Sequence, residues 1–188
     1  MKRKWKLWMI AFVVFVMTDI MMQSNRAEAK KRTFTVSSKT IPCSSSYRQK
    51  PYYNKKTKQY YMINSYMRRL STTGGTLKLK KGTYKIPGTI YVPSNVKIVC
   101  ANGVKIKKTK ATGTKKVKST KFLFQMISEE KASGKQNTGK YAASKNASIQ
   151  GNGKVIFDMG NVNGATAVFV GHASGITVSG VRFRNKKG

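Results

Sequence analysis

The chain has 188 residues, of which 38 are Lys or Arg and five are Asp or Glu, so its formal charge is +33. A catalytic site built on several carboxylates would draw on a very small pool, and the single histidine, His172, excludes a multi-histidine metal site within one chain. Two cysteines allow at most one disulfide and exclude a cysteine-based zinc site. The length suits one domain, and a hydrophobic fraction of 39% is enough for a core.

Residues 1–29 have the pattern of a Sec-type signal peptide. A basic start is followed by an eleven-residue apolar run, LWMIAFVVFVM (7–17), and by Ala27-Glu28-Ala29, which fits the small-x-small cleavage pattern. The apolar run is short for a bilayer span, although residues 20–22 could lengthen it into an uncleaved anchor. In either case we expect the rest of the chain to be secreted or held at the cell surface, with membrane contact only through this segment.

Removal of residues 1–29 raises the ratio of basic to acidic residues. It takes away five basic and two acidic residues, which leaves 33 basic residues against Glu129, Glu130 and Asp158. Export also places Cys43 and Cys100 where a disulfide could persist, and Cys100 should face inward on its strand. Two free thiols fit the pattern equally well.

Residues 30–57 are polar, basic and rich in tyrosine, and we expect an extended lead-in. Residues 58–72 place apolar side chains at helical spacing, which predicts a short amphipathic helix that ends before Gly74-Gly75. The apolar positions of this helix are Met62, Ile63, Tyr66, Met67 and Leu70.

From residue 75 onward the apolar period changes to two, which is typical of strands, and Gly, Pro and Asn interrupt it as turns. No second helix is predicted, and 108–121 and 129–145 are expected to be loops between strands. The alternation through 77–92 is continued by predicted strands at 96–100, 103–107, 122–127, 147–150, 153–158, 167–170, 176–179 and 181–184.

Short strands bounded by Gly or Asn fit a sandwich, a barrel or a solenoid. The segments SIQGNGKVIFDM (148–159) and GITVSGVRFRN (175–185) each hold two strands parted by a glycine-containing corner. If these segments are successive rungs of a coil, their inward residues are Ile149, Val155 and Phe157 in one rung and Ile176, Val178, Val181 and Phe183 in the next.

The segments GGTLKLKKGTYKI (74–86) and IYVPSNVKIVCANGVKI (90–106) resemble the first coils of right-handed parallel β-helix proteins of the pectin lyase-like superfamily. ASIQGNGKVIFDM (147–159) and SGITVSGVRFRN (174–185) look like further rungs. The resemblance implies an all-β fold, a right-handed parallel β-helix (solenoid) with a short N-terminal capping helix. The chain would then consist of a signal peptide (1–29), a basic Tyr-rich lead-in (30–57) and N-terminal coils (58–188).

The resemblance also bears on activity. Such proteins are commonly polysaccharide lyases or glycoside hydrolases, and others are tailspikes, adhesins and surface proteins. Hydrolysis needs two carboxylates about 5–10 Å apart, and a calcium site needs about 6–8 oxygen ligands. Three acids do not offer either arrangement, so we expect no catalytic residue, no metal and no cofactor here. The chain stops directly after a strand, whereas a solenoid needs a terminal cap, so we expect truncation at the C-terminus of a longer protein.

Lysines alternate with the inward apolar residues of several strands. In stacked rungs, outward lysines should form a ladder of like charge whose repulsion an anionic polymer relieves. A solubilising surface is the alternative explanation of this charge. The polyanion-binding candidates are Lys78, Lys80, Lys97, Lys105 and Lys107.

The lead-in and the predicted helix carry tyrosines among basic residues. Aromatic rings can stack on sugars beside a cationic groove, and the candidates for this are Tyr52, Tyr53 and Tyr60. The alternative is that these tyrosines pack the lead-in against the helix. A specific nucleic-acid partner is not expected, because export separates the protein from nucleic acid.

The leading hypothesis is therefore an exported β-helix protein that engages an acidic polysaccharide or another anionic cell-wall polymer. It would be the N-terminal portion of a pectin-lyase-like polysaccharide lyase or glycoside hydrolase. A noncatalytic cell-surface or cell-wall adhesion module that uses the lysine-rich faces is the alternative, and a tailspike-like structural piece is a third hypothesis.

Overall fold

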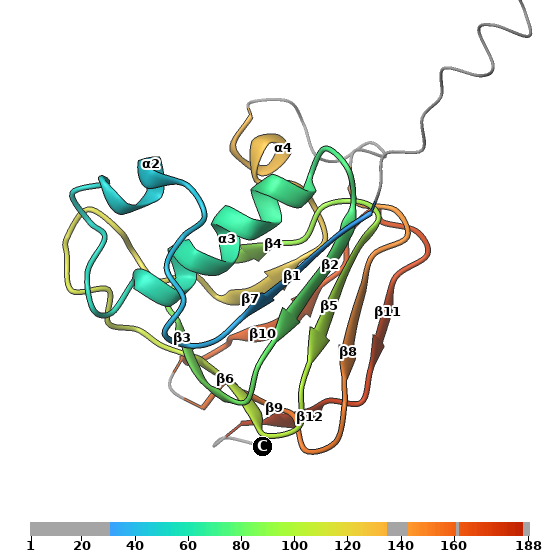
Figure 1. Cartoon of the computed structure of the whole chain (residues 1–188). Coiled ribbons are helices and arrows are strands. Elements are labelled where there is room, and N and C mark those ends of the chain that lie inside the picture. The colour runs from blue at the N-terminus through green and yellow to red at the C-terminus, as the bar shows by residue number, and fades with distance from the viewer. Residues whose placement is uncertain (1–30, 135–142, 161, 186–188) are drawn as a thin grey trace, which may run out of the picture. The chain divides into compact units, whose positions relative to one another are not determined.

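The computed structural model describes residues 31–134, 143–160 and 162–185. The predicted signal peptide lies outside the described residues. Within them the chain is mostly β, and its strands form three parallel sheets accompanied by a few helices (Figure 1).

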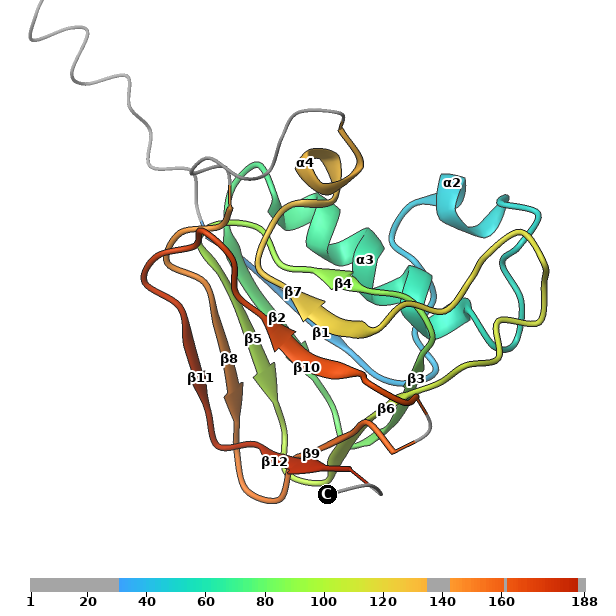
Figure 2. The same ribbon diagram turned by 180° about the vertical axis from the view of Figure 1, so that it is seen from behind.

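The sheets contain five, four and three strands, and every strand pairing within them is parallel. The five-stranded sheet has, in order, β1 (Arg32–Val36), β2 (Gly75–Leu79), β5 (Val96–Cys100), β8 (Ser148–Gly151) and β11 (Thr177–Ser179). The four-stranded sheet has β12 (Arg182–Arg184), β9 (Ile156–Asp158), β6 (Val104–Lys108) and β3 (Gly82–Ile86). The three-stranded sheet, in front in Figure 2, has β10 (Thr166–Phe169), β7 (Phe122–Gln125) and β4 (Ile90–Tyr91).

From β2 onward the chain visits the five-, four- and three-stranded sheets in a fixed rotation. Parallel neighbours cannot be joined by a hairpin, and here the crossover between them is made by strands of the other two sheets. Gly75 pairs with Val96, 21 residues further on, whereas Lys97 pairs with Ser148, 51 residues further on. The longer passage holds the segments that flank β7.

Alternation within the strands builds one core between the sheets. Leu77, Ile98 and Ile149 follow one another in register across β2, β5 and β8, and each is at most 1% exposed. Phe157 is fully buried, with its ring centroid 5.3 Å from that of Phe124 in the three-stranded sheet. The predicted inward positions in 148–159 are therefore confirmed.

The second predicted rung also has the expected register, but its burial differs. Val178 pairs with Ile149, and Phe183 pairs with Phe157. Val178 and Phe183 are nevertheless 36% and 59% exposed, because β11 and β12 are the outer strands of their sheets.

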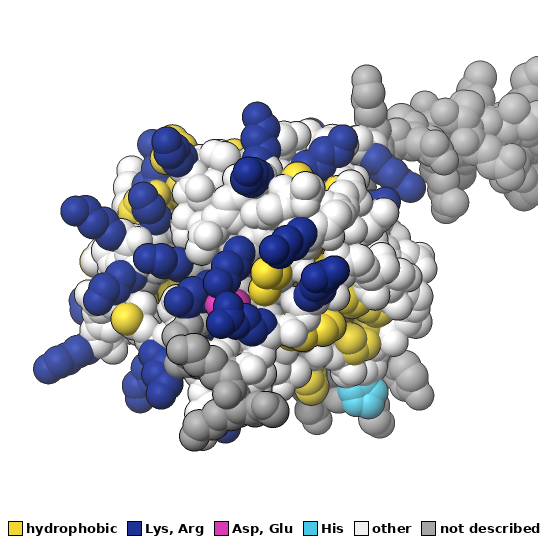
Figure 3. All heavy atoms as spheres, turned by 90° about the horizontal axis from the view of Figure 1, so that it is seen from below, with side chains coloured by type: hydrophobic (Ala, Val, Ile, Leu, Met, Phe, Trp, Pro, Cys, Tyr) yellow, Lys and Arg dark blue, Asp and Glu magenta, His cyan; other side chains and the backbone are white. Residues whose placement is uncertain are grey.

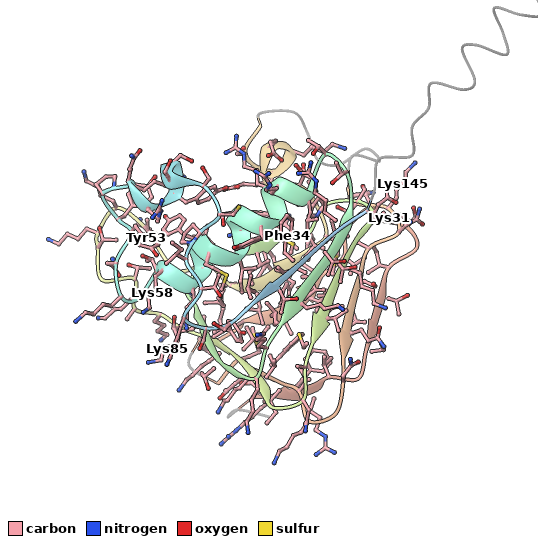
Figure 4. All side chains as sticks on the ribbon, in the orientation of Figure 1. Lys31, Phe34, Tyr53, Lys58, Lys85 and Lys145 are labelled. Atoms are coloured by element: carbon pink, nitrogen blue, oxygen red, sulfur yellow. The ribbon has the colours of Figure 1, made fainter. Side chains whose placement is uncertain are left out.

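The predicted amphipathic helix is α3 (Lys58–Leu70). Its buried residues Met62, Ile63, Met67 and Leu70 join the core formed by β2, β3 and β4. Tyr66 is only partly buried, and its ring centroid lies 5.2 Å from that of Phe34 on β1. Figure 4 labels Phe34.

Three elements differ from the sequence-based expectation. The lead-in is not merely extended, because β1 pairs with β2 and is followed by a short helix, α2 (Ser45–Arg48). The expected loop at 129–145 begins with a further helix, α4 (Glu129–Ser133). Each of these elements is five residues or shorter, so periodicity could not reveal it.

Polar residues occupy the left-handed corners between strands. Asn95 and Asn146 precede β5 and β8 with φ of 59° and 52°, a region that asparagine tolerates better than most residues. The Asn95 N–H donates to the carbonyl oxygen of Lys145 at 2.9 Å, so one corner supports the next. His172, with φ of 53°, lies between β10 and β11.

Candidate polyanion-binding site

The outward side of the four-stranded sheet carries most of the strand-borne positive charge. Lys85, Lys107, Asp158 and Arg184 form one column in register across the sheet, and Thr83, Lys105, Ile156 and Arg182 form the next. We call the outward side chains of Lys85, Lys105, Lys107, Arg182 and Arg184 the basic face. Seen from below, Lys and Arg side chains gather around a small acidic spot (Figure 3).

The predicted ladder over β2 and β5 is not formed. Lys78 is in register with Val99, and Lys97 lies between Thr76 and Ser148, so these lysines do not stack on one another. Lys80 lies beyond the end of β2 and is exposed. Of the five candidates, the structure brings together Lys105 and Lys107. The remaining members of the basic face are Lys85, Arg182 and Arg184, which sequence reasoning missed.

Asp158 is the acid within the basic face. Its Oδ2 lies 3.0 Å from the Lys105 Nζ, and its Oδ1 accepts from the Gly160 N–H at 3.2 Å. Burial would raise the pKa of Asp158, but the hydrogen bonds from Lys105 and Gly160, with the charges of Lys105 and Arg184, outweigh burial and lower it. The carboxylate is therefore held ionised and engaged by a lysine.

One end of the basic face opens into a hollow of about 490 Å³. We call it the lysine hollow, because its lining contains the side chains of Lys55, Lys56, Lys85, Lys107 and Lys110. Thr109 also lines it, and its buried Oγ1 has no hydrogen-bond partner among the residues that the structure describes. None of the described lining residues is acidic.

The wall formed by Lys55 and Lys56 is held by a tight turn. The Asn54 Oδ1 accepts from the Lys56 N–H at 2.8 Å, and the Asn54 N–H donates to the Thr57 Oγ1 at 2.9 Å. Thr57 is fully buried and donates to the carbonyl oxygen of Tyr52 at 2.7 Å. The two lysines are thus presented by a fixed turn.

Two further hydrogen bonds join the walls of the hollow. The Asn54 Nδ2 donates to the Thr112 carbonyl oxygen at 2.9 Å, and the segments that carry these residues lie side by side in Figures 1 and 2. On the other side, the Gln59 Oε1 accepts from the Lys85 N–H at 2.6 Å. Figure 4 labels Lys58 and Lys85 on this side of the molecule. The hollow is therefore built from three segments fixed to one another.

Lys108 follows Lys107 on β6, so its side chain points to the opposite side of the sheet, into the core. Its side chain is fully buried, and its Nζ donates to the Gly88 carbonyl oxygen at 2.5 Å, the Phe122 carbonyl oxygen at 2.6 Å and the Thr120 Oγ1 at 3.0 Å. Burial lowers the pKa of Lys108 to about 7. This lysine fastens the corner after β3 to the start of β7, and sequence reasoning assigned it to a loop.

The tyrosine candidates gather around one ring. The ring centroids of Tyr52, Tyr53 and Tyr60 lie 5.7, 6.3 and 4.8 Å from that of Tyr61. The Lys50 Nζ lies 5.5 Å from the same centroid. These contacts pack the lead-in against α3, which is the alternative to sugar stacking. Burial raises the pKa of Tyr60.

The two glutamates lie on α4 and have partners of their own. The Tyr47 hydroxyl donates to the Glu129 Oε2 at 2.7 Å, and the Arg68 Nε lies 3.4 Å from the Glu130 Oε1. Burial, the hydrogen bond to Glu129 and its charge raise the pKa of Tyr47. The expected loop is therefore a helix where it carries the two glutamates, and Glu129 ties that helix to α2.

The cysteines are both free thiols, with Cys43 exposed and Cys100 buried as its strand phase predicted. Burial raises the pKa of the Cys100 thiol to about 12. The described residues contain no group of three or more His, Cys, Asp and Glu that could hold a metal ion. In the same residues, no helix has the length and hydrophobicity required to cross a membrane.

Comparisons of the chain with protein-family models, curated proteins and solved structures gave no match. The proposal below therefore rests on the sequence and the geometry.

Proposed function

We propose that the chain forms coils of a right-handed parallel β-helix, with α3 closing their N-terminal end, and that its basic face binds an acidic polysaccharide outside the cell. The rotation of the chain through three parallel sheets supports the coil, because each turn adds one strand to each sheet. The right-handedness of the coil follows from the strong preference of crossover connections between parallel strands for the right-handed form. Export rests on the signal-peptide pattern of residues 1–29.

The binding proposal rests on the two columns of outward side chains that lie in register across the four-stranded sheet and carry the basic face. Strands in such a sheet are about 4.8 Å apart, so Lys85 and Lys107 hold like charges close together. Asp158 offsets part of this repulsion by its ion pair with Lys105. A bound polyanion would offset the rest and would release its own counterions, which makes the binding salt-dependent.

The environment of the acidic residues favours binding of the polysaccharide without its cleavage. Each of the three acids among the described residues has a structural partner: Tyr47 for Glu129, Arg68 for Glu130 and Lys105 for Asp158. A glycoside hydrolase needs a free acid and a base across the substrate. Membership of a longer polysaccharide lyase or hydrolase stays a prediction from the resemblance.

The double variant Arg182→Gln/Arg184→Gln should weaken binding to polygalacturonate and make it less salt-dependent. Two fewer charge contacts should lower the slope of log affinity against log salt by about 1.5. The matched control is Lys78→Gln/Lys97→Gln, which removes the same charge from exposed positions on the five-stranded sheet. Affinity measured by calorimetry at several salt concentrations reports both effects.

Equal loss in both double variants would contradict the assignment to the basic face, because it would indicate attraction by net charge alone. The same samples should release no unsaturated products or reducing ends from polygalacturonate. Any turnover would show that binding without catalysis is the wrong description.

A further inference from the structure

The lysine hollow differs from the rest of the basic face in its chemistry. The outer columns mix Arg, Lys, Thr and Ile with one carboxylate, whereas the hollow brings five lysines together with no acid among its described lining residues. The lysines come from three segments that are tied by the Asn54–Thr112 and Gln59–Lys85 hydrogen bonds. Such a concentration of like charge in a fixed frame is costly without a ligand.

The residue types indicate which anion would fit. Planar carboxylates are matched by the two-pronged guanidinium of arginine, and the hollow contains none. Lysine ammonium groups act as point charges that can surround the oxygens of a tetrahedral phosphate from several directions.

The size of the hollow supports more than one phosphate group. Five ammonium groups call for several negative charges within about 490 Å³. In polygalacturonate each single charge is carried on a bulky sugar ring. Phosphate groups joined by flexible linkers can fold back so that more than one of them enters the same hollow.

We propose that the lysine hollow is a subsite for the phosphate groups of an anionic polymer, with Lys85 and Lys107 among the lysines that line it. This inference rests on the proposed function, since it names the polymer chemistry that one end of the basic face selects. The polymer class is a polyol phosphate, and the outer columns of the basic face would follow the same chain away from the hollow.

The test compares three ligands at one ionic strength by calorimetry. An oligomer of poly(glycerol phosphate) is matched in number of charges to an oligogalacturonate, and inorganic pyrophosphate serves as the free-phosphate arm. We expect the wild-type protein to bind the phosphate oligomer about tenfold more tightly than the oligogalacturonate, the effect of roughly one charge-assisted hydrogen bond. Pyrophosphate should bind more weakly than the phosphate oligomer, because it cannot extend along the basic face.

Two double variants test whether the preference for the phosphate oligomer arises in the lysine hollow. Lys85→Gln/Lys107→Gln should abolish it, while the matched control Lys78→Gln/Lys97→Gln keeps it, and circular dichroism verifies that both variants are folded. Equal affinity of the wild-type protein for both oligomers would overturn the phosphate subsite and leave the proposed function intact. Loss of all polymer binding would overturn both. If pyrophosphate bound as tightly as the oligomer, the hollow would be assigned to free phosphate rather than to a polymer.

Discussion

Replacing Gly75 with alanine should destabilise the protein by at least about 3 kcal/mol, the combined effect of a strained backbone and an overpacked core. Gly75 begins β2 with φ of 127°, a conformation that residues with a Cβ rarely adopt. A Cβ at this position would overlap the carbonyl oxygen of Arg32 and would lie 2.9 Å from the Arg32 N and 3.0 Å from the Leu70 Cδ2. The new methyl group would therefore push β1 away from β2 and α3.

Gly164→Ala is the matched control for this substitution. Gly164 also has a positive φ, of 64°, but a Cβ there would meet nothing within 4 Å. Its cost should stay near about 1 kcal/mol, the cost of the left-handed backbone alone. Denaturant unfolding monitored by circular dichroism gives both free energies, and equal costs in the two variants would contradict the close packing of β1 on β2.

Replacing Lys108 with methionine should cost about 2–4 kcal/mol at pH 8.5, where the side chain is largely an uncharged amine, because the variant leaves the carbonyl oxygens of Gly88 and Phe122 without their Nζ donor. Methionine has nearly the same length, so the variant removes the donor while leaving little empty volume. Lys97→Met is the control: Lys97 is exposed on β5, and its replacement should change the free energy of unfolding by less than about 0.5 kcal/mol.

The pH dependence of this difference is a second readout of Lys108. Burial lowers its pKa from 10.5 to about 7, so between these values the unfolded chain binds the proton and the folded chain does not. The contribution of Lys108 to stability should therefore rise with pH from about 7, by roughly 1 kcal/mol per pH unit. Below that pH the cost of burying the charge is fully present.

The measurement is the free energy of unfolding of wild type and Lys108→Met at pH 7.0, 7.8 and 8.5. The difference between the two proteins isolates Lys108 from groups that titrate in both, such as Cys100, whose raised pKa acts in the opposite direction at higher pH. Parallel profiles for the two proteins would contradict a lowered pKa at Lys108.

The strands could be predicted from the sequence because each carries its own alternation. A strand with one buried and one outward side can be recognised without its neighbours, as the pairs Leu77 and Leu79 in β2 and Ile98 and Cys100 in β5 show. The inward side of each strand followed from the same alternation, and Ile149, Val155 and Phe157 are buried as predicted.

The basic face could not be predicted, because it depends on the register between strands. Register is set by the number of residues in each passage, and the passage from Lys97 to Ser148 is more than twice as long as that from Gly75 to Val96. The prediction of a ladder therefore named the lysines without their partners, and the structure places Lys85 beside Lys107.

The lysine hollow was hidden for a different reason. It needs Asn54 to meet Thr112, 58 positions further along the chain, and both belong to segments without periodicity. Several lysines lie in 105–118, and Lys108 is in phase with the buried Val104 and Ile106, but the predicted strand ended at residue 107 and so left Lys108 in a loop.

Lysine footprinting tests the central claim most directly. The protein is acetylated briefly with and without polygalacturonate, and mass spectrometry reports the modification of each lysine. The basic face should be protected by the polymer, with acetylation of Lys85 and Lys107 falling several-fold while that of the exposed Lys78 and Lys97 stays unchanged. Equal protection of all four lysines, or protection of Lys78 and Lys97 alone, would contradict binding at the four-stranded sheet.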